Sequence, residues 1–399
     1  MISIFAAVEM APRDPILGLN EAFNAETNPN KVNLGVGVYF GDDGKIPLLA
    51  AVKAAEKARL ETQPARGYQP IEGIAAYNNA VQNLLFGKDS ELLAAGRALT
   101  CECLGGTGAL KVGADYLKRL LPSAKVYISD PSWENHRALF ESAGFTVENY
   151  AYYDTATRGV DFAGMKAAFG AMPAKSVVVL HACCHNPTGA DLTAAQWQEV
   201  VALVKQRDLV AFIDMAYQGF ADGIKQDAVA LDLFAASGLQ FFVSSSFSKS
   251  FSLYGERVGA LTIVTAGKDE SARVLSQVKR VIRTNYSNPP THGGAVVAAV
   301  LSSPDLRQQW EDELAGMRDR IRAMRTSLVE KLAANGAKGF EFIKVQRGMF
   351  SYTGLTAAQV ERLKSEFGIY AVSTGRICVA ALNTRNIDYV AKAIATVIK

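Results

Sequence analysis

A lysine among small hydroxyl side chains is the residue in this sequence with the clearest capacity for chemistry. Lys249 follows the apolar run 239–243 and the serines 244–246. This pattern predicts a buried strand and a turn made by the serines at its end. Partial desolvation lowers the pKa of a lysine, and a neutral amine can attack a carbonyl group to form a Schiff base. The alternative is an ordinary surface lysine in a loop.

Phosphate-binding groups accompany this lysine. Arg257 stands eight residues after Lys249. An amine near a guanidinium suits a cofactor with both an aldehyde and a phosphate, which points to pyridoxal phosphate. The glycine-rich segment 104–111 opens a predicted helix, whose free N–H groups would bind phosphate. Its third glycine position is Lys111, so the dinucleotide fingerprint fails and a nicotinamide dehydrogenase is excluded.

Polar side chains follow two more predicted strands. Asp214 comes after the apolar run 209–213. It either caps the next segment or meets a cation, and beside a pyridinium nitrogen it would make the ring an electron sink. Asn186 follows the run 176–180 in the segment 185–189. It either belongs to a simple turn or donates a hydrogen bond to a ring oxygen.

Three larger side chains complete the candidate set. Trp133 follows the run 125–129 and is either a core residue or a stacking surface for a flat ring. Arg283 and Arg376 could bind carboxylates through two parallel hydrogen bonds, although a single arginine is commonly a solvated surface group. Each group that a pyridoxal phosphate site needs occurs once, at a strand end or turn. Their joint occurrence favours such a site over the separate alternatives.

The composition is that of a globular protein without a strong charge bias. The chain has 399 residues, 49% of them hydrophobic, and its 42 basic and 39 acidic side chains give a net charge of +3. So small a bias gives no reason to expect nucleic acid or an acidic membrane as partner. No apolar run approaches the roughly 20 residues that span a bilayer, and the first residues lack the features of a secretory signal. The five cysteines are expected to be reduced thiols of a cytoplasmic protein.

The segment His181-Ala182-Cys183-Cys184-His185 raises the alternative of a metal site. These side chains are crowded on one extended segment, and no second cysteine–histidine pair has a zinc-type spacing. We therefore expect buried thiols here and no metal.

Apolar strands alternate with helical stretches through the middle of the chain. A helix capped by Thr193 is predicted to end near residue 206. This alternation predicts an α/β fold with a mainly parallel sheet covered on both faces. Ligands bind at the carboxyl ends of the strands in such sheets. A long charged helix is expected over about 305–335, followed by a smaller α+β unit from residue 340.

Several segments together form a highly specific pattern. They are residues 33–39, 68–73, 105–110, 183–189, 216–220, 246–249, 285–290 and 375–376. This pattern resembles the class I aminotransferases of the aspartate/aromatic amino acid group, over essentially the whole chain. The resemblance implies fold type I, a large domain with a mainly parallel sheet flanked by helices plus a smaller α+β domain. The implied domains are an arm at 1–13, a small domain at 14–45 and 315–399, and a large pyridoxal phosphate-binding domain at 46–314.

The resemblance also implies roles for individual residues. Lys249 would form the Schiff base and carry the proton, and Asp214, supported by His136, would pair with the pyridinium nitrogen. Trp133 would stack on the ring. The groups implied at the ring hydroxyl are Tyr217 and Asn186. The groups implied at the phosphate are Gly106, Thr107, Ser246 and Arg257.

Substrate contacts are implied in the same way. Arg376 would hold the α-carboxylate, with Gly37 as a backbone contact and Trp133 and Asn186 nearby. Arg283 would bind a side-chain carboxylate from across a dimer. Tyr68 would reach the phosphate of the neighbouring subunit's cofactor, which implies a homodimer with shared active sites.

The implied activity is ping-pong transamination of aromatic and dicarboxylic L-amino acids with 2-oxoglutarate or oxaloacetate. The segments 132–136, 251–257 and 346–352 are most similar to bacterial aromatic enzymes, and a narrow aspartate aminotransferase is the alternative. A lyase or decarboxylase with the same cofactor would release CO₂ or a side chain instead. A non-enzymatic sensor would need a DNA-binding domain, for which we expect the 13-residue arm to be too short.

Overall fold

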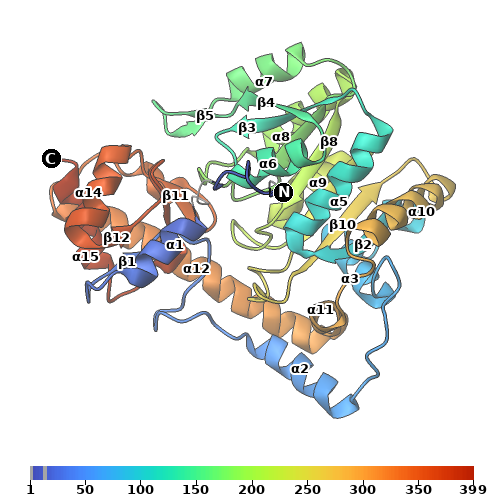
Figure 1. The fold of residues 1–399 in the computed structure, drawn as a ribbon, viewed down its shortest axis with the longest axis horizontal. Helices are drawn as coiled ribbons and strands as arrows, with labels where there is room; N and C mark the ends of the chain where they lie inside the picture. The colour runs from blue at the N-terminus through green and yellow to red at the C-terminus, as the bar shows by residue number, and fades with distance from the viewer. Residues whose placement is uncertain (1–2, 12–15) are drawn as a thin grey trace.

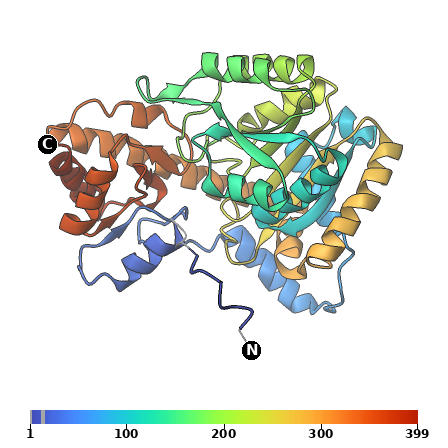
Figure 2. The same ribbon diagram turned by 45° about the horizontal axis from the view of Figure 1, so that its top comes forward.

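The computed structural model describes residues 3–11 and 16–399. The predicted arm, 1–13, and the first residues of the predicted small domain fall partly on residues 1–2 and 12–15, outside the described residues. The described part of the arm, residues 3–11, contains turns and extended chain. It extends away from the rest of the chain (Figure 2).

A seven-stranded sheet forms the centre of the molecule, in the order β2-β10-β9-β8-β7-β3-β4 (Figure 1). The strands from β9 to β4 pair in parallel, whereas β10 runs antiparallel to both of its neighbours. The strands are β2 (Ala98–Leu104), β3 (Lys125–Asp130), β4 (Thr146–Ala151), β7 (Val177–His181), β8 (Val210–Met215), β9 (Phe241–Ser246) and β10 (Val258–Val264).

Helices cover both faces of this sheet (Figure 1). One face packs against α5 (Gly105–Leu120), α6 (Glu134–Ser142) and α10 (Lys268–Asn285). The other packs against α3 (Ala75–Phe86), α7 (Phe162–Ala171), α8 (Ala194–Gln206), α9 (Val229–Ala236) and α11 (Thr291–Ser302).

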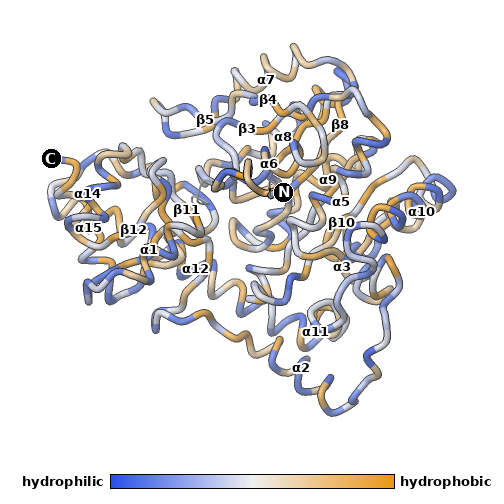
Figure 3. Tube along the Cα trace, in the orientation of Figure 1, coloured by the Kyte–Doolittle hydropathy of each residue, from blue (hydrophilic) through white to orange (hydrophobic). Residues whose placement is uncertain are grey.

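Side chains along the strands alternate between these two faces. Phe212 lies in the core on the α5 side, whereas Ala211 and Ile213 lie in the opposite core. Such two-sided burial explains why an inner strand such as β8 is mostly an apolar run (Figure 3). The predicted α/β fold with a mainly parallel sheet is confirmed, and so is the helix capped by Thr193.

One detail of the predicted strands is wrong. Residues 244–246 were expected to form a turn, but they belong to β9, because they pair with residues 259–261 of β10. Residues 101–103, just before the glycine-rich segment, lie inside β2, which pairs with β10 over its full length. Polar residues are tolerated in both places because the antiparallel ladder satisfies their backbone groups.

A second unit is built from both ends of the chain. β1 (Val32–Asn33) pairs with β12 (Ile369–Tyr370), and β11 (Phe350–Tyr352) pairs with β13 (Arg376–Cys378). The helices around these strands are α1 (Leu17–Ala25), α13 (Phe342–Val345), α14 (Ala357–Phe367) and α15 (Ile387–Val397). The remaining elements are α2 (Ala50–Thr62), α4 (Glu91–Ala94), β5 (Tyr153–Asp154) and β6 (Gly159–Val160).

A long helix joins this unit to the sheet (Figure 1). Helix α12 (Pro304–Ala334) packs on α2 and α11 and also on α13 and α15. It passes the predicted domain boundary at residues 314 and 315 without a break. The boundaries themselves stay a prediction.

A buried arginine of α12 holds the segment that leads into β11. Arg325 is 1% exposed, and its guanidinium donates hydrogen bonds to the carbonyl oxygens of Ile343, Gly348 and Phe350. Charged donors of this kind replace the backbone partners that an irregular segment lacks. The position of β11, and so of Phe350, depends on this side chain.

Arg325→Met should lower the free energy of unfolding by about 3 kcal/mol, since each of three carbonyls left unpaired costs about 1 kcal/mol. Urea denaturation at equal chain concentration measures the change. Arg307→Met is the matched control, because Arg307 pairs with Glu311 on a partly exposed face of the same helix. That variant should change the stability by less than about 1 kcal/mol. Equal losses in both variants would contradict this account of Arg325.

Candidate active site

The strand ends of the sheet meet at one cavity of about 220 Å³. The carboxyl ends of β7, β8 and β9 lie side by side, and β2 leads directly into α5 at the same edge. All residues predicted to contact cofactor or substrate, except Tyr68 and Arg283, line this cavity. They are Gly37, Gly106, Thr107, Trp133, Asn186, Asp214, Tyr217, Ser246, Lys249, Arg257 and Arg376.

Asp214 lies within β8, with 7% of its surface exposed. One carboxylate oxygen is 2.9 Å from His136 Nε2, and the other accepts a hydrogen bond from Ser244 Oγ at 2.8 Å. Burial alone would raise the pKa of this carboxyl. The hydrogen bonds with His136 and Ser244 outweigh it, so the pKa lies below its ordinary value. The structure thus holds an anion at the floor of the cavity.

Lys249 faces this anion from the turn that follows β9. Its Nζ lies 4.7 Å from the centre of the Tyr217 ring. Burial lowers the pKa of Lys249 from 10.5 to about 8, the charge of Asp214 opposes this change, and that of Arg257 adds to it. A substantial neutral fraction is therefore present near pH 8, which a nucleophilic amine needs.

One end of the cavity suits a phosphate group. The chain enters α5 at Gly105, where φ is +69° and a Cβ would lie 2.5 Å from Arg257 Nη2. Only glycine leaves room for that guanidinium. Arg257 donates to Ser248 Oγ at 3.3 Å, and Ser246 faces Gly106. A guanidinium, hydroxyl groups and a helix N-terminus are the donors that a phosphate monoester requires, so these residues fit pyridoxal phosphate.

A buried arginine stands at the opposite side. Arg376, at the start of β13, is 3% exposed and donates to Asn186 Oδ1 at 3.1 Å and to the Gly35 carbonyl oxygen at 2.8 Å. Its Nε has no partner within the described part of the chain. The guanidinium lies 4.4 Å from the centre of the Phe350 ring, and a Cβ on Gly37 would lie 2.8 Å from that ring. This arrangement leaves donor capacity for a carboxylate.

The two predicted aromatic contacts lie at the walls. Trp133 precedes α6, and its ring is 5.2 Å from that of His136 in an edge-to-face arrangement. Tyr217 is 6% exposed and packs edge-on against Phe350, with ring centres 6.0 Å apart. Burial raises the pKa of Tyr217 well above its ordinary value, so its hydroxyl is a neutral donor at physiological pH.

Tyr68 and Arg283 lie elsewhere, on a separate surface hollow that Leu104 and the segment 286–290 also line. Tyr68 is 96% exposed. The Arg283 guanidinium is hydrogen-bonded to Ser287 Oγ and is also exposed. Within one chain, therefore, the structure does not bring these two residues into the cavity.

Several lining residues were not singled out from the sequence. Phe350 and Tyr254 lie inside segments that were recognised, but the chemistry of their side chains gave no signal. Tyr254 accepts a hydrogen bond from the Tyr39 backbone N–H at 2.9 Å, which joins the segment before α2 to the cavity wall. His181 was considered only as a metal ligand. Burial lowers its pKa to about 3, and its neutral Nδ1 accepts the Asn186 N–H at 3.1 Å.

The cysteine-rich segment contributes packing. All five cysteines are free and buried. Within residues 3–11 and 16–399, Cys183, Cys184 and Asp227 form the one group of possible metal ligands. Burial raises the pKa of the Cys184 thiol to about 12. Both Asp227 oxygens already accept two backbone N–H groups each. The absence of a metal stays a prediction.

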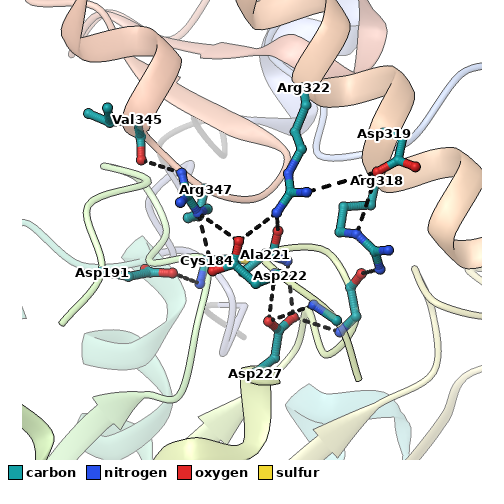
Figure 4. A network of polar contacts seen from close by, with 12 residues as sticks. Cys184, Asp191, Ala221, Asp222, Asp227, Arg318, Asp319, Arg322, Val345 and Arg347 are labelled. Carbon is teal, nitrogen blue, oxygen red and sulfur yellow. Dashed lines mark hydrogen bonds and ion pairs between the residues drawn. The ribbon is translucent and has the colours of Figure 1, made fainter. Parts of the chain in front are cut away.

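The loop that follows Tyr217 is fixed from two sides (Figure 4). Asp227 binds its backbone from below. From α12, Arg318 donates to the Gly219 carbonyl oxygen at 3.0 Å, and Arg322 donates to that of Ala221 at 2.6 Å. Asp222 in the same loop pairs with Arg322 and Arg347. These contacts connect the cavity wall at Tyr217 to the long helix.

Comparison with known proteins agrees with this site. Residues 29–394 match the family model for aminotransferases of class I and II. The chain is 69% identical over 398 residues to an aspartate aminotransferase of Pseudomonas aeruginosa, covering 100% of both chains. It is 51% identical over 397 residues to an aromatic-amino-acid aminotransferase of Escherichia coli, covering 99% of this chain and 100% of the other.

A solved structure leads to the same family. An aromatic-amino-acid aminotransferase from Burkholderia pseudomallei, covalently bound to pyridoxal phosphate, matches with a TM-score of 0.98 and 69% identity, covering 100% of both chains. The fold and the site define an enzyme of the aminotransferase class. The chain belongs to the class I and II aminotransferase family, and the predicted family is confirmed.

The charge of Asp214 should set the reactivity of Lys249. In cofactor-free enzyme, modification of Lys249 by an amine-selective reagent should rise with a midpoint near pH 8, because only the neutral amine reacts. In Asp214→Asn the anion that favours the ammonium form is gone, so the midpoint should move to lower pH. Peptide mass spectrometry measures the modification. A wild-type midpoint near pH 10, or a shift to higher pH in the variant, would contradict the assignment.

Proposed function

We propose that this chain transfers amino groups between L-amino acids and 2-oxo acids with pyridoxal phosphate as its cofactor. One observation carries the proposal. A lysine amine with a pKa of about 8, a buried carboxylate and a phosphate-type donor set face one cavity. The relative that holds pyridoxal phosphate covalently supports it, because it is 69% identical over the full chain.

The side chains have separate tasks in this proposal. Bound pyridoxal phosphate supplies an aldehyde that condenses with amines and a ring that withdraws electrons. Lys249 provides the amine that would hold the cofactor and, once released, would accept a proton from the substrate α-carbon and pass it to the cofactor carbon that carried the aldehyde. Asp214 keeps a positive charge on the ring nitrogen, because it stays an anion despite its burial. Tyr217 and Asn186 donate to the ring hydroxyl.

The remaining cavity residues position the reactants. Gly106, Thr107, Ser246 and Arg257 hold the phosphate. Trp133 would stack on the ring and so fix its orientation relative to Lys249.

Two classes of amino donor fit the proposed site. Arg376 binds the α-carboxylate that all donors share, with Gly37 as a backbone contact. Arg283 binds the distal carboxylate of aspartate or glutamate and moves toward water when an aromatic ring enters, because an unpaired buried charge is costly. The alternative is a narrow aspartate aminotransferase. The relatives are consistent with either possibility, since one is named an aspartate aminotransferase and another an aromatic-amino-acid aminotransferase.

We also propose a homodimer with shared sites. Tyr68 and Arg283 are exposed in their own chain, although the proposed chemistry needs them at a cavity. Large apolar side chains are exposed in the arm and before α2, which suits contact with a second copy. These side chains are Ile4, Phe5, Val8, Met10, Ile46 and Leu48. The predicted division of each chain into an arm, a small domain and a large domain is also part of this proposal.

No helix in the described part of the chain could span a membrane. The cytoplasmic location stays a prediction.

Mixed dimers test the shared sites. A Lys249→Ala chain and a Tyr68→Phe/Arg283→Ala chain are each expected to be inactive toward aspartate. A one-to-one mixture should recover about a quarter of the wild-type rate, because half of the dimers then contain one intact site. Lys249→Ala mixed with Arg376→Ala is the control and should recover nothing, since both residues belong to the same site. Absence of recovery in the first mixture would contradict shared sites.

Arg283→Leu tests whether Arg283 binds the distal carboxylate of the substrate. The variant should lose about a hundredfold in kcat/KM for aspartate, or roughly 3 kcal/mol for a charge-assisted pair, and should spare phenylalanine. A panel of amino donors with 2-oxoglutarate, run on wild type and variant, measures both. If wild type uses aspartate but neither phenylalanine nor tyrosine, the narrow alternative replaces dual specificity. An equal loss for both donors would refute the role of Arg283, and CO₂ release without amino exchange would indicate a decarboxylase.

A further inference from the structure

A carboxyl group that the proposed chemistry does not use is buried on β2, two residues before Leu104, which lines the hollow of Tyr68 and Arg283. Glu102, on β2, is 2% exposed. Its Oε2 accepts a hydrogen bond from the Ile74 backbone N–H at 3.2 Å. Its Oε1 faces Gly294 on α11, where a Cβ would lie only 2.0 Å away. The two oxygens of one carboxyl group thus face two different segments of the chain.

Glycine is required on both sides of this carboxyl. A Cβ on Gly73, where φ is +88°, would lie 2.3 Å from Glu102 Cβ and 2.6 Å from Oε2. Together with Gly294, this glycine lets the backbone of both segments approach the acid directly. Glu102 is therefore packed between segment 68–74 and segment 283–294. We call the contact between these two segments the seam.

Further contacts join the same segments. The Glu102 N–H donates to the Glu72 carbonyl oxygen at 2.9 Å, and the Glu102 carbonyl accepts from Tyr286 Oη at 3.4 Å. Gln69 Nε2 donates directly to Thr291 Oγ1 across the seam at 2.9 Å. Each of the two segments carries one of the exposed residues at its start, Tyr68 in segment 68–74 and Arg283 in segment 283–294. Leu104, two residues after Glu102, lines the hollow that both of these residues share.

We propose that Glu102 is a positioning residue for substrate selection, because it holds together the two segments that present Tyr68 and Arg283 to the neighbouring subunit. The inference rests on the proposed function, in which Arg283 binds the distal carboxylate of the substrate. It adds that the preference for dicarboxylic over aromatic substrates depends on this buried acid.

The charge state of the acid gives the proposal a measurable signature. Burial raises the pKa of Glu102 to about 7, and the Ile74 N–H only partly opposes this change. The acid is therefore neutral below pH 7 and becomes an anion above it. With one N–H donor in the seam, the anion is poorly satisfied, so the segments should loosen as the pH rises.

The ionisable groups around Glu102 have other partners or other pKa values. Burial raises the pKa values of Tyr77 on α3 and of Tyr286, and that of Cys103 to about 12, so these three stay neutral. Burial likewise raises the pKa of Cys101 well above its ordinary value. Glu72 pairs with Lys279 at 2.8 Å, and His292 on α11 pairs with Glu56 at 3.3 Å on an exposed face.

Equilibrium binding to the holoenzyme separates these effects from catalysis. Succinate is the dicarboxylate probe and 3-phenylpropionate the aromatic monocarboxylate probe, both measured by calorimetry from pH 6.5 to 8.5. Glu102→Gln keeps the shape and an acceptor for Ile74 but cannot ionise. Glu102→Met keeps the bulk but removes the acceptor. His292→Gln is the matched control for a second titratable group on α11.

Wild type should lose succinate affinity relative to Glu102→Gln as the pH rises through 7, by about tenfold, the effect of one charge-assisted hydrogen bond. Glu102→Met should bind succinate weakly at every pH, and no variant should change the binding of 3-phenylpropionate. His292→Gln should follow wild type.

Two results would overturn the inference. One is equal succinate affinity of wild type and Glu102→Gln at every pH. The other is equal weakening of both probes in Glu102→Met, which would indicate a merely structural role. Arg283→Leu separates failure of this inference from failure of the proposed function. If this variant binds succinate as tightly as wild type, Arg283 does not bind the distal carboxylate, and the proposed function is wrong on that point.

Discussion

The anion of Asp214 inside a buried sheet is the interaction on which the rest of the site depends. A carboxylate in such a place is unstable unless it is paired and hydrogen-bonded. His136 and Ser244 supply these contacts at 2.9 and 2.8 Å. The charge that they stabilise faces Lys249 and opposes the effect of burial on its amine. Removal of the anion would therefore alter the lysine as well as the cofactor ring that we propose between them.

This electrostatic pair can exist because parallel strands end together. Asp214 pairs with His181 on one side and Ser244 on the other, so three polar side chains from distant parts of the sequence are adjacent at one edge of the sheet. The helix start at Gly105 and the guanidinium of Arg257 reach the same edge, since β2 and β10 pair directly. The antiparallel β10 is thus what brings the phosphate-type donors next to the lysine.

Much of this arrangement could be predicted from the sequence, because strand ends and turns carry local signals. The apolar runs predicted four strands of the sheet, and Lys249, Asp214 and Asn186 each follow such a run. The exact strand ends could not be predicted, since residues 244–246 are polar and are held in β9 only by pairing with β10. The positions of Arg376 and Gly37 in the cavity depend on pairing between both ends of the chain, which no local pattern encodes.

Tyr68 and Arg283 illustrate a different limit. Their roles came from the resemblance to a family, and within a single chain they lie on a surface hollow away from the cavity. Glu102 had no signal in the sequence, because its significance lies in the close approach of Gly73 and Gly294 from two segments more than two hundred residues apart. Such a contact arises from tertiary packing alone.

The most direct test of the central claim is to identify the lysine that binds the cofactor. Holoenzyme is reduced with borohydride, digested and mapped by mass spectrometry. The account predicts that the cofactor mass is attached to the peptide that contains Lys249, and that Lys249→Ala shows no such peptide. Attachment to any other lysine, or unchanged labelling in the variant, would contradict it.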